Sequence, residues 1–200
     1  MTEQEKMKKG YLWLDDDENM ALQAHTKSFV NKFNSLPPED MEGREALLKD
    51  IFGNVGENVW IVPPLTAAVG KYVSIGDGTY ANMNLTLIDD WKITIGKHVL
   101  IGPNVTLSTT GHPIHPKHRA DGMYSFPITV GDNVWIGANV IILPGVTIGE
   151  NSVIGAGSVV TKDIPANVVA FGSPCKVYRE INEHDAEYYF KDRRFDEQPD

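Results

Sequence analysis

An interval of six residues between aliphatic side chains constrains this chain more than any other feature of its sequence. One uninterrupted series consists of Val130, Ile136, Ile142, Ile148, Ile154 and Val160. Shorter series with the same interval begin at Ile75 and Ile95, and a glycine directly follows most of these aliphatic residues. A helix repeats every 3.6 residues and cannot keep a strict period of six, whereas a strand alternates its side chains between two faces. The pattern therefore predicts a repeat structure from about residue 54 onward.

Three such hexapeptides predict one coil of a parallel β-helix. In each unit the aliphatic residue points inward, the small residue fits a tight corner, and polar pairs occupy the turns. A triangular coil then contains eighteen residues, so Ile136 is expected to stack on Ile154 with the strands about 4.8 Å apart. A single coil leaves its core open at both ends, so the array needs several coils and capping segments.

Two interruptions break the period. Leu87 and Ile95 are eight residues apart, which predicts a bulge at Asp89 and Asp90. Leu107 and Val130 are 23 residues apart, which is not a multiple of six. We expect an extruded loop over residues 111–127, and insertions in repeat arrays commonly gather on the functional face.

Residues 1–53 follow a helical pattern instead. An acidic run over residues 15–18 is typical of a helix start, and apolar residues recur after it at helical spacing as far as Pro37. Pro38 predicts the start of a second helix that continues to Ile51. The expected organisation is a helical cap (1–53), a β-helix domain (54–181, with loop 111–127) and a C-terminal tail (182–200).

Composition excludes several classes of function. The net charge is −9, with 18 scattered basic residues against 27 acidic ones, which argues against a nucleic-acid partner. Cys175 is the single cysteine, so neither an internal disulfide nor a CxxC metal site is possible. The first residues contain no apolar run of signal-peptide length, and eighteen consecutive apolar residues occur nowhere. We expect a cytoplasmic protein with no membrane partner.

Three histidines, His112, His115 and His118, lie in the expected loop, in the segment GHPIHPKH. They are compatible with polar surface residues, with zinc ligands, or with a general base that takes a proton from a hydroxyl. Pro113 and Pro116 prevent a regular helix, so the spacing is not a helical metal motif. Spacing alone does not choose His112 over its neighbours.

The hexapeptide array and several longer segments closely resemble the maltose/galactoside O-acetyltransferase family. The segments are YANMN (80–84), IDDWKITIG (88–96), LSTTGHPIHP (107–116), MYSFPITVGDNVWIGANVIILPGVTIG (123–149) and NSVIGAGSVVTKDIPANVVAFGSPCKVYREI (151–181). The resemblance spans nearly the whole chain and implies a mainly-β fold, a left-handed parallel β-helix. It also implies a homotrimer with active sites at subunit interfaces, acetyl-CoA as co-substrate, a sugar acceptor and no required metal.

By this resemblance His112 matches the family's catalytic base. It would take the proton from a sugar hydroxyl, whose oxygen attacks the thioester carbonyl while CoA thiolate departs. Backbone N–H groups would stabilise the tetrahedral oxyanion. A galactoside is the expected acceptor, with maltose or glucose as the alternative inside the family.

The resemblance also assigns binding residues. The matching acceptor-side positions are Asp15, Asn82, Asp90 and Met123. The matching CoA-side positions are Ala138, Ala156, Thr161, Lys162, Lys176 and Arg179. Carboxylates and amides suit the hydroxyls of a sugar, and cations suit the phosphates of CoA. The structural alternatives are a helix cap for Asp15, a turn amide for Asn82, a bulge residue for Asp90 and solvated surface charge for the cations. Trp135 is expected either to cover the pantetheine arm or to pack at a corner.

Departures from the family pattern leave some alternatives open. Ala138 replaces a frequent serine and Lys176 a frequent arginine, and neither change abolishes the role. Ala68 stands where close relatives have residues that contact the sugar, and its side chain cannot form hydrogen bonds. The identity of the acceptor sugar therefore stays open.

Two other classes of function compete with an acetyltransferase. One is a zinc-dependent hexapeptide-repeat carbonic anhydrase, and the clustering of the histidines in one loop argues against it. The other is a non-enzymatic trimeric scaffold.

Overall fold

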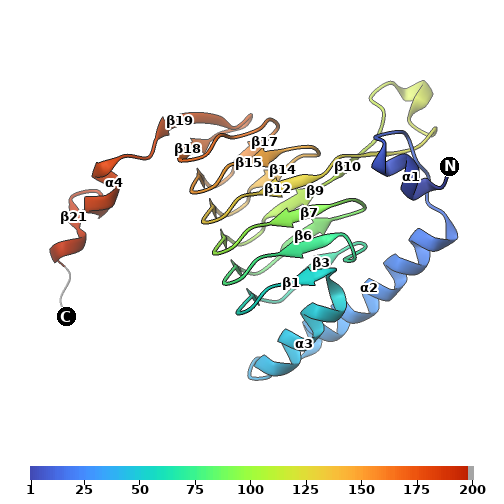
Figure 1. Cartoon of the computed structure of the whole chain (residues 1–200), viewed down its shortest axis with the longest axis horizontal. Helices are drawn as coiled ribbons and strands as arrows, with labels where there is room; N and C mark the ends of the chain where they lie inside the picture. Colours follow the sequence, from blue (N-terminus) through green and yellow to red (C-terminus); the bar gives the residue numbers. More distant parts are fainter. Residues whose placement is uncertain (198–200) are drawn as a thin grey trace.

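A β-solenoid of stacked triangular coils forms the body of the protein (Figure 1), and the computed structural model describes residues 1–197. Three parallel sheets form its three sides, which we number in the order in which the chain visits them.

Sheet 1 contains β1 (Asn54–Val55), β4 (Val73–Ile75), β7 (Ile93–Ile95), β12 (Ile128–Val130) and β15 (Thr147–Ile148). Sheet 2 contains β2 (Trp60–Ile61), β5 (Tyr80–Ala81), β8 (Leu100–Ile101), β13 (Trp135–Ile136), β16 (Val153–Ile154) and β18 (Val168–Phe171), with β19 (Lys176–Glu180) added antiparallel. Sheet 3 contains β3 (Leu65–Ala67), β6 (Leu85–Ile88), β9 (Thr106–Ser108), β14 (Ile141–Ile142) and β17 (Val159–Val160).

The register confirms the predicted stacking and corrects the predicted coil length. Ile136 pairs with Ile154, eighteen residues later, as the hexapeptide pattern predicted. In the first coils, however, Ser74 pairs with Thr94, which is twenty residues later. The prediction of eighteen residues is wrong there, because these coils have a wider corner between sheet 3 and sheet 1, where the predicted bulge at Asp89 and Asp90 lies.

Inward-facing aliphatic side chains fill the solenoid with one continuous core. Ile93, Ile128, Ile136 and Ile154 are all 0% exposed. Burial of an isoleucine side chain contributes roughly 1.5–3 kcal/mol, so the stacked column is the main source of stability. Buried side chains recur every six residues because each side of the prism supplies equivalent inward positions to each coil.

Asparagines stack at the corner between sheet 1 and sheet 2, which we call the asparagine corner. Asn133, Asn151 and Asn167 have φ angles of 56°, 61° and 60°, in the left-handed region that asparagine tolerates better than most residues. Their side-chain amides form a ladder, because Asn133 donates to Asn151 at 3.2 Å and Asn151 donates to Asn167 at 2.8 Å.

Three helices precede the solenoid: α1 (Glu3–Lys8), α2 (Asp17–Ser35) and α3 (Met41–Ile51). The sequence predicted only two. It missed α1, although Thr2 and Glu5 form a capping box at its start. The predicted start of α3 at Pro38 is also wrong, because the side chain of Asp40 accepts the Gly43 N–H at 2.9 Å and caps the helix there.

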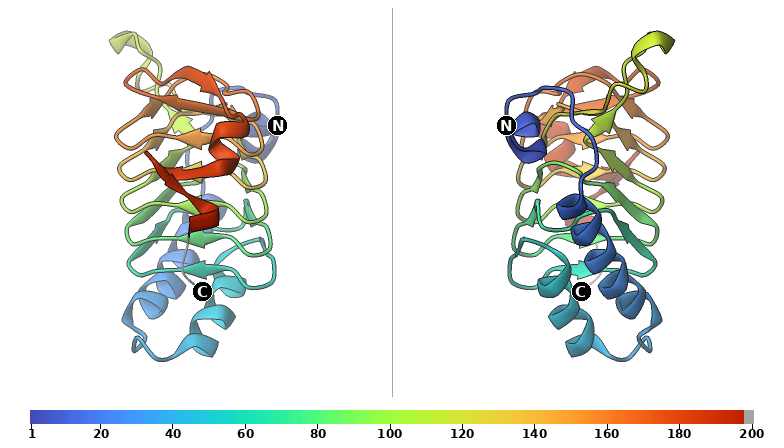
Figure 2. Two further views of the ribbon diagram at one scale, coloured as in Figure 1. Left: turned by 90° about the vertical axis from the view of Figure 1, so that its left-hand side faces the viewer. Right: turned by 90° about the vertical axis from the view of Figure 1, so that its right-hand side faces the viewer.

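The N-terminal helices cover the first coil and reach along the solenoid. Phe33 and Leu48, from α2 and α3, are buried in the same apolar core as the strands of the first coil. Figure 2 shows α2 and the segment before it running along the outside of the stacked coils toward the end that bears the loop. None of the helices within residues 1–197 has both the length and the hydropathy that crossing a membrane requires.

A loop and an arm project from the coils. The loop, yellow-green in Figure 1, has a stem in which β10 (Thr110–Gly111) pairs antiparallel with β11 (Tyr124–Ser125), and it includes the short turn η1 (Pro116–His118). It projects where the second interruption predicted an extruded loop. The arm follows β19 and contains α4 (Glu183–Glu187), β20 (Tyr188–Phe190), β21 (Arg193–Arg194) and η2 (Phe195–Glu197).

Candidate functional site

The corner between sheet 3 and sheet 1 carries both interruptions of the repeat, and we call it the site corner. Asp89 and Asp90 lie on it between β6 and β7, and one coil later the chain leaves β9 to form the loop. His112 is the first residue after β10 and its side chain is exposed. The histidine is therefore attached directly to the stem of the loop and not to its tip.

A chain of hydrogen bonds holds that stem. The indole N–H of Trp13 donates to the Ser125 hydroxyl at 3.0 Å, and the Ser125 and Thr110 hydroxyls are 2.7 Å apart. The interaction of the Thr110 side chain with Asp90 lowers the pKa of that carboxyl. Trp13 and Ser125 are each 1% exposed. The backbone two residues before His112 is thus fixed to three separate segments of the chain.

Two predicted acceptor-side carboxylates, Asp90 and Asp15, lie near this network. Burial raises the pKa of Asp90, the hydrogen bond from Thr110 opposes that rise, and the nearby negative charge of Asp15 adds to it. Asp15 itself is exposed and accepts a hydrogen bond from the Gln23 amide at 3.3 Å. The helix-cap interpretation of Asp15 is wrong, because Asp16 caps α2 by accepting the Asn19 N–H at 2.9 Å.

Met123 joins the N-terminal segment to the loop. Its backbone forms two hydrogen bonds with that of Trp13, at 2.9 and 2.8 Å, in an isolated antiparallel bridge. The structure therefore brings Asp15, Asp90 and Met123 to the corner that carries His112.

Asn82 and the two predicted alanines lie elsewhere, at the corner between sheet 2 and sheet 3. Asn82 precedes β6 and Asp90 follows it, so the two residues lie at opposite ends of one strand. The Asn82 side-chain oxygen accepts the N–H of Met83 at 2.8 Å. Ala138 and Ala156 stack in adjacent coils, since the Ala138 carbonyl accepts the Gly157 N–H at 2.8 Å. A single protomer does not bring these three residues to His112.

The predicted CoA-side cations are exposed. Thr161 and Lys162 follow β17, the last strand of sheet 3 along the chain, at the site corner. Lys176 and Arg179 lie on β19. Arg179 already has a partner, because its two terminal nitrogens each donate to a different oxygen of Asp185 at 2.6 Å. This pair raises the pKa of Arg179 and lowers the pKa of Asp185 to about 2. The sequence prediction missed Asp185, although Asn182 and Asp185 have the spacing of a capping box.

The other two loop histidines make local contacts. The His118 ring is 2.7 Å from a carboxylate oxygen of Asp121, and the His115 ring accepts the N–H of Lys117 at 3.2 Å. Among residues 1–197, no three His, Cys, Asp or Glu side chains are grouped so that they could hold a metal ion.

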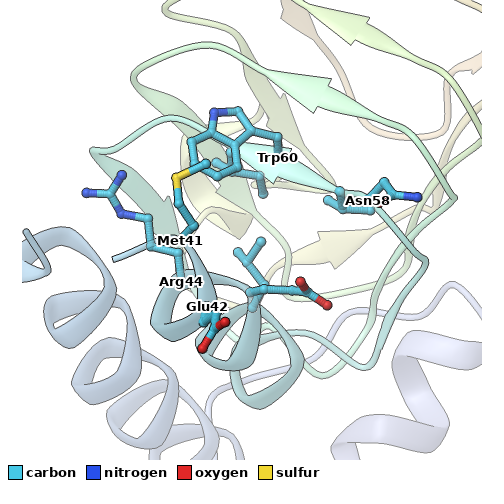
Figure 3. Close-up of a pocket in the computed structure, with 9 residues that line it drawn as sticks. Met41, Glu42, Arg44, Asn58 and Trp60 are labelled. Carbon is cyan, nitrogen blue, oxygen red and sulfur yellow. The ribbon is translucent and has the colours of Figure 1, made fainter. Parts of the chain in front are cut away.

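A cavity of about 320 Å³ lies between α3 and β2, and Figure 3 shows its lining. The side chain of Met41 reaches toward the indole of Trp60, with Glu42 and Asn58 on other parts of the wall. The cavity is at the helical end of the solenoid, far from the loop (Figure 1), and none of the predicted site residues lines it.

Known proteins align with most of this chain. Residues 6–56 match the maltose acetyltransferase hexapeptide capping motif, and residues 127–162 match the bacterial transferase hexapeptide repeat. The galactoside O-acetyltransferase of Escherichia coli K12 is 55% identical over 94% of both chains. The galactoside O-acetyltransferase of Lactococcus lactis IL1403 is 49% identical over 92% of this chain and 87% of its own.

Solved structures match equally well. A galactoside acetyltransferase in complex with coenzyme A superposes with a TM-score of 0.95 at 54% identity, covering 97% of this chain and 98% of that one. A maltose O-acetyltransferase from Clostridium difficile 630 superposes with a TM-score of 0.88 at 42% identity, covering 91% and 98%. A hexapeptide-repeat acetyltransferase from Vibrio cholerae, complexed with acetyl-CoA, has a TM-score of 0.84 at 38% identity, covering 91% and 100%.

Proposed function

Because this chain belongs to the maltose/galactoside O-acetyltransferase family of hexapeptide-repeat proteins, we propose that it transfers the acetyl group of acetyl-CoA to a hydroxyl of a galactoside. One structural observation carries the proposal. Hydrogen bonds from Trp13 to Ser125 and between Ser125 and Thr110 hold the stem that precedes His112, and Thr110 also acts on the pKa of Asp90, which supports a shared site at this corner. This corner is also where the regular repeat is interrupted.

His112 acts as the general base. Its neutral imidazole takes the proton of the acceptor hydroxyl, and the oxygen attacks the carbonyl carbon of the thioester. The tetrahedral adduct then collapses, the carbon–sulfur bond breaks, and the imidazolium returns the proton to the departing thiolate. A general base contributes typically about 10²- to 10⁴-fold to the rate. A rigid stem supports this role, since the base must stay within hydrogen-bond reach of the hydroxyl.

The acceptor sugar binds to carboxylate and backbone groups beside His112. Asp15 and Asp90 accept hydrogen bonds from sugar hydroxyls, and Met123 contacts the sugar from the loop. The proximity of the two carboxylates supports this assignment, because paired acceptors can orient a polyhydroxyl ligand in one way. Asn82 belongs to the same site across a subunit boundary and contacts the reacting centre.

The active enzyme is a homotrimer with each site between two protomers. The division of the site supports this, because Asn82, Ala138 and Ala156 lie at the far end of sheet 3 from His112. A second observation is an apolar column on the outer face of sheet 2, formed by Trp60, Tyr80, Leu100, Trp135 and Val153 in register. Leu100 is 51% and Trp135 55% exposed in the single protomer. A neighbouring copy that covers this column would bury it.

Acetyl-CoA binds along the upper coils. Ala138, Ala156 and Thr161 contribute close backbone or hydroxyl contacts, and the phosphates meet Lys162, Lys176 and Arg179. Coenzyme A or acetyl-CoA is bound in the solved structures of two relatives, which supports the assignment. Arg179 approaches a phosphate while one edge of its guanidinium is held by Asp185.

The test is acetyl-CoA-dependent release of free thiol across a panel of sugars. We expect release with galactosides and much less with glucose or maltose. Release with maltose or glucose instead would show that the acceptor is one of these sugars, with the same acetyl-transfer reaction. The absence of release with every sugar, from protein that binds acetyl-CoA, would contradict the proposed activity.

A further inference from the structure

Asp89 is a buried carboxylate that the reaction described above does not use. Its side chain is 0% exposed, and it directly precedes Asp90 in the bulge between β6 and β7. Burial raises its pKa to about 6, although backbone N–H groups that donate to it act in the opposite direction. A buried carboxylate is costly unless it forms hydrogen bonds, so its contacts indicate its role.

The carboxylate joins two coils of the site corner. One oxygen accepts the N–H of Ala68 at 2.7 Å, and both oxygens lie 3.3 Å from the N–H nitrogen of Val69. The second oxygen also accepts the N–H of Gly70. Three successive donors of the preceding coil thus converge on one side chain. The corner is compact, because Gly70 has φ +71° and an added Cβ there would meet the Ile51 carbonyl.

Helix α2 is attached to Val69, the middle residue of this segment. The Thr26 hydroxyl, itself 1% exposed, donates to the Val69 carbonyl at 2.6 Å. The helix begins at Asp17 with Asp16 as its N-cap, so Asp15 lies two residues before a rigid helical segment that includes Thr26. The position of Asp15 therefore depends on where segment 68–70 holds α2.

We propose that Asp89 is a positioning residue that fixes the two acceptor-side carboxylates, Asp15 and Asp90, relative to each other. Asp90 follows Asp89 in the chain, and Asp15 is connected to Asp89 through segment 68–70, Thr26 and α2. When the carboxylate holds segment 68–70, the helix and the bulge move as one body. This inference depends on the proposed function, since it concerns the binding of that acceptor.

The variant Asp89→Asn tests the connection with almost no change in shape. Its amide keeps one acceptor oxygen but turns an NH₂ group toward backbone donors, so at least one N–H loses its partner. We expect the KM for the sugar to rise about 10- to 100-fold, the scale on which a misplacement of about 1 Å acts. The KM for acetyl-CoA is expected to change less than twofold, because its binding residues lie on other coils.

Asp132→Asn is the matched control. Asp132 also joins two coils through a backbone N–H, that of Lys97 at 2.8 Å, but at the asparagine corner. A purely structural role for such aspartates predicts similar behaviour of the two variants. We expect Asp132→Asn to leave the KM for the sugar unchanged. Thr26→Val, which breaks the other link of the same connection, is expected to raise the KM for the sugar by a smaller factor.

The outcomes separate this inference from the proposed function. If the unaltered protein acetylates no sugar, the proposed function fails before Asp89 is considered. If it is active and Asp89→Asn keeps its KM for the sugar, or raises both KM values equally, the positioning role is overturned. If Asp89→Asn does not fold, Thr26→Val decides, and an unchanged KM for the sugar then overturns the inference.

Discussion

The two corners that flank sheet 1 show how one repeat serves two purposes. The asparagine corner is built from stacked asparagines in the left-handed region, and its amides hydrogen-bond from coil to coil. The site corner is built differently in each coil: by the N–H groups of segment 68–70, by the Asp89–Asp90 bulge, and by the loop. The regular corner stabilises the stack, and the irregular corner gathers buried and partly buried polar groups.

The electrostatics of the two corners differ as much as their geometry. The asparagine corner carries exposed charges, such as the ion pair of Lys97 Nζ with Asp77 Oδ2 at 2.9 Å. Water largely screens the attraction between such exposed charges. The site corner contains the buried Asp89 and the partly buried Asp90, and burial raises the pKa of both. Perturbed carboxylates of this kind are frequent at functional sites, although ion pairs and buried structural groups also show them.

The largest expected effect comes from the site corner. His112→Ala removes the general base without removing a core side chain, so we expect kcat to fall about 10³-fold while the melting temperature stays within the error of measurement. Steady-state kinetics and thermal unfolding of the same preparation check this. Turnover equal to that of the unaltered protein would remove His112 from the mechanism and with it the functional distinction between the corners.

A substitution in the buried aliphatic core should affect the stability of the whole solenoid, including both corners. Ile154 is 0% exposed and stacks on Ile136. Ile154→Ala should lower the free energy of unfolding by about 2–5 kcal/mol, since it removes buried methyl groups and leaves a cavity. Denaturant unfolding measures the loss. At a temperature where the variant is folded, KM for the sugar should be unchanged; a selective change would mean that the core tunes the site corner directly.

The pH dependence of stability should reveal the buried carboxylate of the site corner. The pKa of Asp89 is about 6 in the folded protein and 3.8 is its ordinary value, so the folded state holds its proton more tightly. The stabilisation that this proton gives to the folded state is fully present below pH 3.8 and is lost as the pH rises through 6. The free energy of unfolding falls by at most about 3 kcal/mol over this range. Unfolding in urea between pH 4.5 and 7.5 should show the unaltered protein losing stability relative to Asp89→Asn. A difference that is independent of pH would contradict the raised pKa.

The smallest expected effect lies at the asparagine corner. Asn151→Ala removes two amide hydrogen bonds of the ladder and places alanine at a φ of 61°, so we expect a loss of about 1–2 kcal/mol. Asn151→Gly, which tolerates this φ, is the control and should lose less. Acetyl transfer by both variants should match that of the unaltered protein. A drop in kcat for either variant would show that the asparagine corner takes part in function.

The candidate site was only partly accessible to sequence reasoning. The broken period located the loop and the bulge, and the family resemblance selected His112 among three histidines. Two contacts were out of reach: the three N–H groups that meet at Asp89, and the pairing of Arg179 with Asp185. Both join residues whose relative placement depends on the path of a corner or an arm, and no periodic pattern encodes such a path.

The sequence by itself determined the solenoid, its inward column and the places where its period fails. It could do so because every coil uses the same inward position, so that a local spacing of six residues implies contacts such as that of Ile136 with Ile154. Only the tertiary structure decided that the coil from β1 to β4 also contains twenty residues, that α1 forms, and that Asn82 and His112 lie at opposite ends of sheet 3. Those outcomes depend on side-chain caps and on how wide corners stack on one another, which are contacts between segments that share no repeat.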